Sequence, residues 1–171
     1  AMTYPDAERY RASYEAAIDR LAREGDGTVE GSPGISVKLS ALHPKYNFFH
    51  TDRSVGDLLP ILRHLAGRAC EANIHFTIDA EEAERLELSL DVIEALVRDS
   101  SLFERPDGTQ WTGFGLAIQA YQKRAVPLCD WVTRLARKHN RRLFVRLVKG
   151  AYWDTEIKLS QVGGFDDFPV F

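Results

Sequence analysis

Apolar residues recur along the chain in two spacings that alternate from one end to the other. Apolar positions three and four residues apart predict amphipathic helices at about 6–23, 58–65, 83–98 and 126–139. Shorter apolar runs between them predict strands at about 35–40, 74–79, 113–119 and 143–148. Ser54 is the expected N-cap of the second helix. Asp154 opens a last, short helical pattern, which Gly163 and Gly164 end.

Strands that alternate with helices indicate right-handed βαβ units and a parallel sheet, so the expected fold class is α/β. Four strands leave two architectures open, namely a doubly wound sheet and part of a barrel. No phosphate-binding glycine motif follows the first strand, which argues against a dinucleotide fold. A complete (β/α)8 TIM barrel needs about 250 residues. The 171 residues of this chain would therefore form about half of one.

Each expected strand carries a polar residue near its carboxyl end. These residues are Lys38, Asp79, Gln119 and Arg146, and Lys149 follows the last strand. The fourth strand is otherwise apolar and is expected to be buried on both faces, where cations are costly without an anionic partner. The carboxyl ends of parallel strands meet at one edge of a sheet. Together the four side chains would suit a substrate with a carboxylate and an amine, or a cofactor with an electron-rich ring.

Simpler structural roles remain open for the same residues. A single buried Lys–Asp or Arg–Asp pair is often only structural. Gly113 and Gly115, which precede Gln119 on one face, leave room for a flat ligand or merely for close packing. Tyr152 and Trp153 are either stacking surfaces or core aromatics. The clustered carboxylates Glu81, Glu82 and Glu84 are expected to stabilise a helix N-terminus.

Composition and charge exclude several classes of function. The net charge of −3 disfavours a nucleic-acid-binding module, which needs a basic face. No apolar run is long enough to span a membrane. The histidines lack ligand spacing, so no metal is expected; they are His43, His50, His64, His75 and His139. Cys70 and Cys129 are expected to be reduced core thiols of a cytoplasmic protein, with a disulfide left open.

Four segments resemble one known family. GISVKLSALHP (34–44), DAEEAERLEL (79–88), QAYQKR (119–124) and RLVKGAYWD (146–154) are similar to the proline dehydrogenase domain, in the bacterial bifunctional form called proline utilization A. The resemblance implies an N-terminal helix and linker at 1–33 and a partial barrel at 34–171. It also implies a cytoplasmic FAD enzyme that oxidises L-proline to Δ1-pyrroline-5-carboxylate. The electrons would pass to a membrane quinone, with peripheral membrane association of the parent protein.

The resemblance also implies a role for each motif residue. Lys38 would pair with the proline carboxylate, Asp79 would hold basic groups in the substrate pocket, and Tyr152 would pack against the proline ring. Arg146 would lie near the reactive nitrogen of the flavin, so Lys38, Asp79 and Arg146 are the expected catalytic residues. The expected FAD-binding residues are Gln119, Arg146, Val148, Lys149, Gly150, Ala151 and Trp153.

In this family the barrel continues beyond the position of Phe171, so the chain would carry half of a site. We therefore expect weak FAD binding and little turnover from the chain alone. Open sheet edges would favour self-association, or mark a truncated product. Two alternatives stay open: a non-catalytic half-barrel assembly unit, and another flavin barrel of the methylenetetrahydrofolate reductase type.

Overall fold

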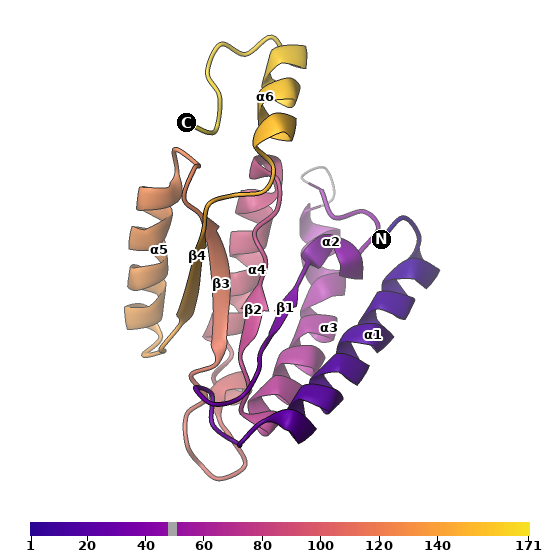
Figure 1. Cartoon of the computed structure of the whole chain (residues 1–171), viewed down its shortest axis with the longest axis vertical. Coiled ribbons are helices and arrows are strands. Elements are labelled where there is room, and N and C mark those ends of the chain that lie inside the picture. The colour runs from indigo at the N-terminus through magenta and orange to yellow at the C-terminus, as the bar shows by residue number, and fades with distance from the viewer. Residues whose placement is uncertain (48–50) are drawn as a thin grey trace.

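Four parallel strands form a single sheet in their order along the chain (Figure 1). The computed structural model describes residues 1–47 and 51–171. The strands are β1 (Ile35–Val37), β2 (Phe76–Ile78), β3 (Phe114–Gln119) and β4 (Phe144–Val148), and each pairs in parallel with the next. A doubly wound sheet reverses its strand order at a switch point. This sheet does not, so its topology is that of consecutive units of a (β/α) barrel.

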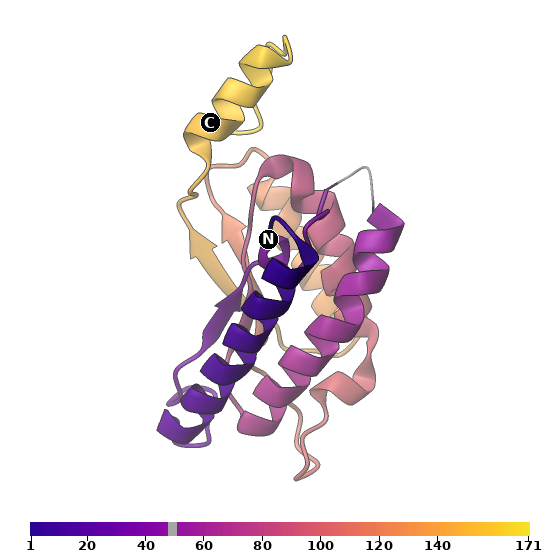
Figure 2. The same ribbon diagram turned by 90° about the vertical axis from the view of Figure 1, so that its right-hand side faces the viewer.

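Helices connect the strands and cover one side of the sheet (Figure 2). The crossover helices are α3 (Thr51–Ala72), α4 (Leu86–Arg98) and α5 (Ala125–Lys138). The N-terminal helix α1 (Tyr4–Glu24) packs against α3. Its first turn is fixed by a capping box, in which Thr3 and Asp6 each satisfy a backbone N–H of the other. The shorter elements are α2 (Leu39–Leu42), η2 (Ala83–Arg85), η3 (Ser100–Phe103) and α6 (Trp153–Val162).

The hydrophobic core lies between the sheet and these helices. Alternate residues of β3 point into it, since Phe114, Leu116 and Ile118 are at most 2% exposed. The opposite face of β3 carries Gly115 and Ala117. A Cβ atom on Gly115 would lie 2.0 Å from the Phe144 carbonyl oxygen, so this glycine allows close approach of β4. Of the two roles considered for Gly115, close packing is the one observed.

Predicted element boundaries were wrong at three places. The second strand was expected at 74–79, but β2 spans only Phe76–Ile78. The first strand was expected to reach Ser40, but β1 ends at Val37 because the backbone turns at Lys38 into the short helix α2. Ser54 was expected to cap the second helix, but α3 already begins at Thr51. The Ser54 hydroxyl instead donates to the carbonyl oxygen of Lys45 at 2.9 Å. Ser54 therefore anchors the preceding loop from inside the helix.

The prediction that the fourth strand is buried on both faces was also wrong. β4 is an edge strand that pairs only with β3, and Leu147 is 65% exposed. An apolar run shows that a strand can be buried, but burial depends on whether other elements cover its two faces. Cys129 is exposed rather than in the core, whereas Cys70 is buried, and both are free thiols. No helix within residues 1–47 and 51–171 is long and apolar enough to cross a membrane.

Candidate active site

An open depression of about 300 Å³ lies at the carboxyl end of the sheet. Its lining residues are Lys38, Asp79, Ala80, Ala117, Gln119, Arg146, Val148, Lys149, Gly150, Ala151 and Tyr152. Nine of the ten expected site residues are therefore gathered at one place. Trp153 is the exception: it lies outside this lining at the start of α6, half exposed, and its Nε1–H donates to the Phe171 carbonyl oxygen at 2.9 Å.

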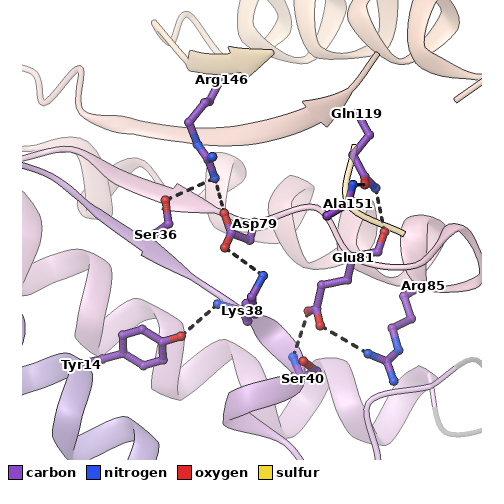
Figure 3. A network of polar contacts seen from close by, with 10 residues as sticks. All are labelled: Tyr14, Ser36, Lys38, Ser40, Asp79, Glu81, Arg85, Gln119, Arg146 and Ala151. Carbon is purple, nitrogen blue, oxygen red and sulfur yellow. Dashed lines mark hydrogen bonds and ion pairs between the residues drawn. The ribbon is translucent and has the colours of Figure 1, made fainter. Parts of the chain in front are cut away.

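An ion network centred on Asp79 forms the polar part of the depression (Figure 3). The Lys38 ammonium lies 3.2 Å from Oδ2 of Asp79, and Nη2 of Arg146 donates to Oδ1. The same Nη2 atom also lies 3.4 Å from the Ser36 hydroxyl oxygen. The carboxylate is 16% exposed, whereas both cations remain accessible. One charge cluster that faces the opening is thus formed by the residues that directly follow β1 and β2 and by one residue of β4.

The charge balance of this cluster favours an anionic ligand. Burial is the largest single effect on the pKa of the Lys38 ammonium and lowers it, but the Asp79 carboxylate, together with Tyr152 and Glu81, raises the pKa overall. Lys38 is therefore a cation at neutral pH, as is Arg146. Two cations against one carboxylate leave one positive charge. In addition, the Nε–H of Arg146 is buried and has no hydrogen-bond partner, which leaves one donor unsatisfied.

The Gln119 amide joins two loops of the site. Its Nε2 donates to the Glu81 carbonyl oxygen at 2.9 Å, and its Oε1 accepts from the Ala151 backbone N–H at 3.2 Å. The side chain is buried, with only 3% of the residue exposed. Sequence reasoning placed Gln119 at the site, which the geometry matches. It did not foresee that both ends of the amide are engaged with backbone groups.

The segment 149–152 has a backbone shape that requires glycine. Gly150 has φ of 128°, and a Cβ atom there would lie 2.3 Å from Cε1 of Tyr121. Tyr121 contacts this segment three times. Its ring packs on Gly150, its N–H donates to the Lys149 carbonyl oxygen at 3.1 Å, and its hydroxyl accepts from the Tyr152 N–H at 3.0 Å. Tyr121 thus holds the backbone of the segment 149–152 in place.

The aromatic side of the depression is Tyr152. Burial raises the pKa of its phenol, while the nearby Lys38 ammonium lowers it in part. The same coupling acts on Lys38, so the two side chains are neighbours. An ammonium beside a half-buried aromatic ring can bind a carboxylate and a small apolar ring together.

Two buried carboxylates near the site were missed by sequence reasoning. Glu81 was assigned to a helix N-terminus, but it accepts from the Ser40 N–H at 3.1 Å and from Arg85 at 3.3 Å. Glu156 of α6 accepts from the Ala83 N–H at 2.6 Å, and burial raises its pKa. The position of Glu81 two residues after Asp79 was an available signal. Glu156 gave none, because it lies in an ordinary polar stretch.

No group of three or more His, Cys, Asp or Glu side chains that could hold a metal ion occurs within residues 1–47 and 51–171. His50 lies outside the described residues.

The chain is similar to one family over its whole length. A family model described as proline dehydrogenase matches residues 1–171. Two curated relatives are named bifunctional protein PutA: the protein of Rhizobium meliloti is 51% identical over 99% of this chain, and that of Escherichia coli is 47% identical over 100% of it. The chain spans 13% of the length of these relatives.

Solved structures show the same fold. A mutant of proline utilization A from Bradyrhizobium japonicum is 53% identical, with a TM-score of 0.93 over 100% of this chain and 17% of its own. The proline utilization A of Bdellovibrio bacteriovorus inactivated by N-propargylglycine is 26% identical, with a TM-score of 0.86 over 99% of this chain and 18% of its own. These matches agree with the expected α/β units of a TIM barrel.

Proposed function

This chain belongs to the proline dehydrogenase family, and on that basis we propose that the protein carrying it oxidises L-proline to Δ1-pyrroline-5-carboxylate with FAD. The observation that carries the proposal is the cluster of Lys38, Asp79 and Arg146 at the carboxyl end of the sheet, with its one net positive charge. Family membership also decides against a barrel of the methylenetetrahydrofolate reductase type. The division into a linker region at 1–33 and a partial barrel at 34–171 stays a prediction.

Proline carries a carboxylate, an amine and an apolar ring, and the depression offers a partner for each. Lys38 would bind the carboxylate, since its raised pKa keeps it charged. The ring would pack against Tyr152, which neighbours Lys38. Asp79 holds both cations, and so fixes where the carboxylate can bind. These residues bind and orient the substrate so that the carbon next to the amine faces the cofactor.

The residues present suit a flavin ring. When bound, FAD supplies the two-electron oxidation. Arg146 has an unsatisfied Nε–H, and a flavin ring has acceptor atoms for such a donor. Ala117 and Ala151, with methyl side chains, and Gly150, with none, line the opening, which leaves room for a flat ring. Val148, Lys149 and Trp153 would complete the contacts. Gln119 would have to release one of its two backbone partners to bind the ring.

We further propose that the parent protein is cytoplasmic and passes electrons to a membrane quinone through peripheral membrane association. Family resemblance supports this step. This step requires a route for electrons from the depression to the membrane surface. That route is not formed by the described residues of this chain.

For the chain alone we propose weak FAD binding and little turnover. The depression is open, and the strands that line it leave the β4 edge unpaired. A second function for the isolated chain, that of a non-catalytic assembly unit, is favoured by the exposed apolar side chains of β4.

The visible absorption spectrum tests these proposals. The 171-residue chain and the full-length parent protein are each incubated with FAD, desalted and scanned. A flavin spectrum in the parent that bleaches with L-proline supports the proposed reaction, and an absent or unbleached spectrum rejects it. Retained flavin in the chain alone rejects both the proposed weak FAD binding and the assembly-unit alternative. A colourless chain agrees with both, and a flavin absorbance that shifts only with excess FAD before desalting then favours weak binding over the assembly unit.

A further inference from the structure

Two tyrosine hydroxyls outside the depression hold the backbone of two residues inside it. The hydroxyl of Tyr14, on α1, accepts from the Lys38 N–H at 3.2 Å (Figure 3). The hydroxyl of Tyr121, in the loop after β3, accepts from the Tyr152 N–H at 3.0 Å. Neither tyrosine lines the depression. The two contacts come from unrelated parts of the chain, yet they fix the main chain at the two points from which the proposed substrate-binding side chains project.

The chemical state of both phenols suits this role. Burial raises the pKa of Tyr14 and of Tyr121, while the accepted backbone bond lowers each in part. Both therefore stay neutral at physiological pH and use an oxygen lone pair as the acceptor. Lys38 stands at the turn from β1 into α2, and Tyr152 precedes α6. At these positions the backbone N–H groups of Lys38 and Tyr152 are not bonded within a strand, so each needs an acceptor from elsewhere.

We propose that Tyr14 and Tyr121 are positioning residues of the proline site, which together set the spacing between the Lys38 ammonium and the Tyr152 ring. This inference rests on the proposed function. Each tyrosine acts through the residue that it holds, and neither touches the substrate. The loss of either hydroxyl lets one wall of the site move relative to the other, which weakens simultaneous binding of the carboxylate and the ring of proline.

The test uses the full-length protein and removes one hydroxyl at a time, as Tyr14→Phe and Tyr121→Phe. Tyr10→Phe is the matched control, because Tyr10 lies on the same helix as Tyr14, is 43% exposed and has the Arg9 guanidinium over its ring. We expect the KM for L-proline to rise about 3- to 10-fold in each test variant, the effect of one lost hydrogen bond. We expect kcat and flavin content to stay within about twofold, as they do when only ground-state binding is weakened.

A second readout does not depend on turnover. Cyclopentanecarboxylate has the ring and carboxylate of proline without its nitrogen. In isothermal titration calorimetry its Kd should rise by the same factor as KM in both test variants and stay unchanged in Tyr10→Phe.

The outcomes separate this inference from the proposed reaction. A wild-type protein that does not oxidise L-proline rejects the proposed function. A wild-type protein that does, with an unchanged KM in both test variants, overturns the positioning role. The role is also overturned if the loss of activity in the test variants is fully explained by lost flavin, or by a lower melting temperature. If one variant folds poorly, the other decides, because the two tyrosines lie on different elements.

Discussion

Asp79 and Arg146 form an ion pair that reaches across β3, because β2 and β4 lie on either side of that strand. Ala117 of β3 is paired in register with Arg146 and lines the same depression. Its methyl group leaves the space above the strand open, so the two side chains can meet. The small side chain on β3 and the ion pair therefore belong to one arrangement, and Arg146 is held in place by the carboxylate that also holds Lys38.

Replacement of Asp79 by asparagine should lower the kcat/KM of the full-length protein for L-proline by about 10- to 100-fold. The change removes a charged acceptor shared by Lys38 and Arg146, and hydrogen bonds to charged groups contribute about 1.5–3 kcal/mol. Steady-state kinetics measure the effect. Asp107→Asn is the control, since it breaks an Arg105–Asp107 ion pair of 2.7 Å in a loop away from the site. A similar loss in both variants would contradict a specific role for Asp79.

Gly150→Ala should disrupt the segment 149–152 and reduce flavin retention. The backbone conformation at φ of 128° costs about 1–3 kcal/mol for a residue with a side chain. A methyl group would in addition collide with the Tyr121 ring. Flavin content after desalting and the thermal midpoint measure the result. Gly108→Ala is the control, because Gly108 also has a positive φ, of 77°, but has open space around it. Equal flavin loss in both variants would rule out this explanation.

Much of the site could be predicted because strands of a parallel sheet are normally apolar throughout, so polar residues at their ends stand out. Lys38, Asp79, Gln119 and Arg146 break the apolar pattern of their strands, and parallel strands bring their carboxyl ends to one edge. Alternation also assigned the faces of β3 correctly, since Phe114 and Ile118 point into the core. These features depend on local periodicity, which the sequence carries directly.

The remaining features depend on contacts between residues far apart in the chain. The exposure of β4 depends on its position at the edge of the sheet and not on its own apolar residues. Glu156 reaches Ala83 across 73 positions of the sequence, and nothing near Glu156 indicates that it is buried. The turn at Lys38 shortens β1, although Leu39 to Leu42 continue an apolar pattern. In each case tertiary contacts override a local preference.

Glu156 should make the contact between α6 and Ala83 weaker as pH rises. Its pKa is raised above the reference value of 4.5, chiefly by burial, with Glu82 and Glu84 adding to the rise and the Ala83 N–H and Arg124 opposing it. Glu156 therefore binds its proton more tightly when it contacts Ala83 than when that contact is broken. This stabilisation is fully present below pH 4.5 and is lost as pH rises through the raised pKa.

Hydrogen exchange of the peptide that contains Ala83 can measure this effect in wild type and Glu156→Gln at the same pH. Glutamine keeps an acceptor oxygen but does not ionise. The protection of wild type relative to the variant should fall as pH rises from below 4.5 toward neutrality, and then level off. A constant difference, or one that grows in favour of wild type, would show that Glu156 does not titrate in contact with Ala83.

The unpaired edge of β4 should make the isolated 171-residue chain self-associate. Val145 and Leu147, 39% and 65% exposed, share one face of this edge strand, and exposed apolar edges pair with other chains. Sedimentation velocity should show dimers or larger species at micromolar concentration. Val145→Lys and Leu147→Lys should shift them to monomer, because a charge on the edge opposes pairing. Val126→Lys is the control, since Val126 is 74% exposed but lies on α5. A wild-type chain that stays monomeric at every concentration, or equal effects of all three substitutions, would show that the β4 edge does not drive association.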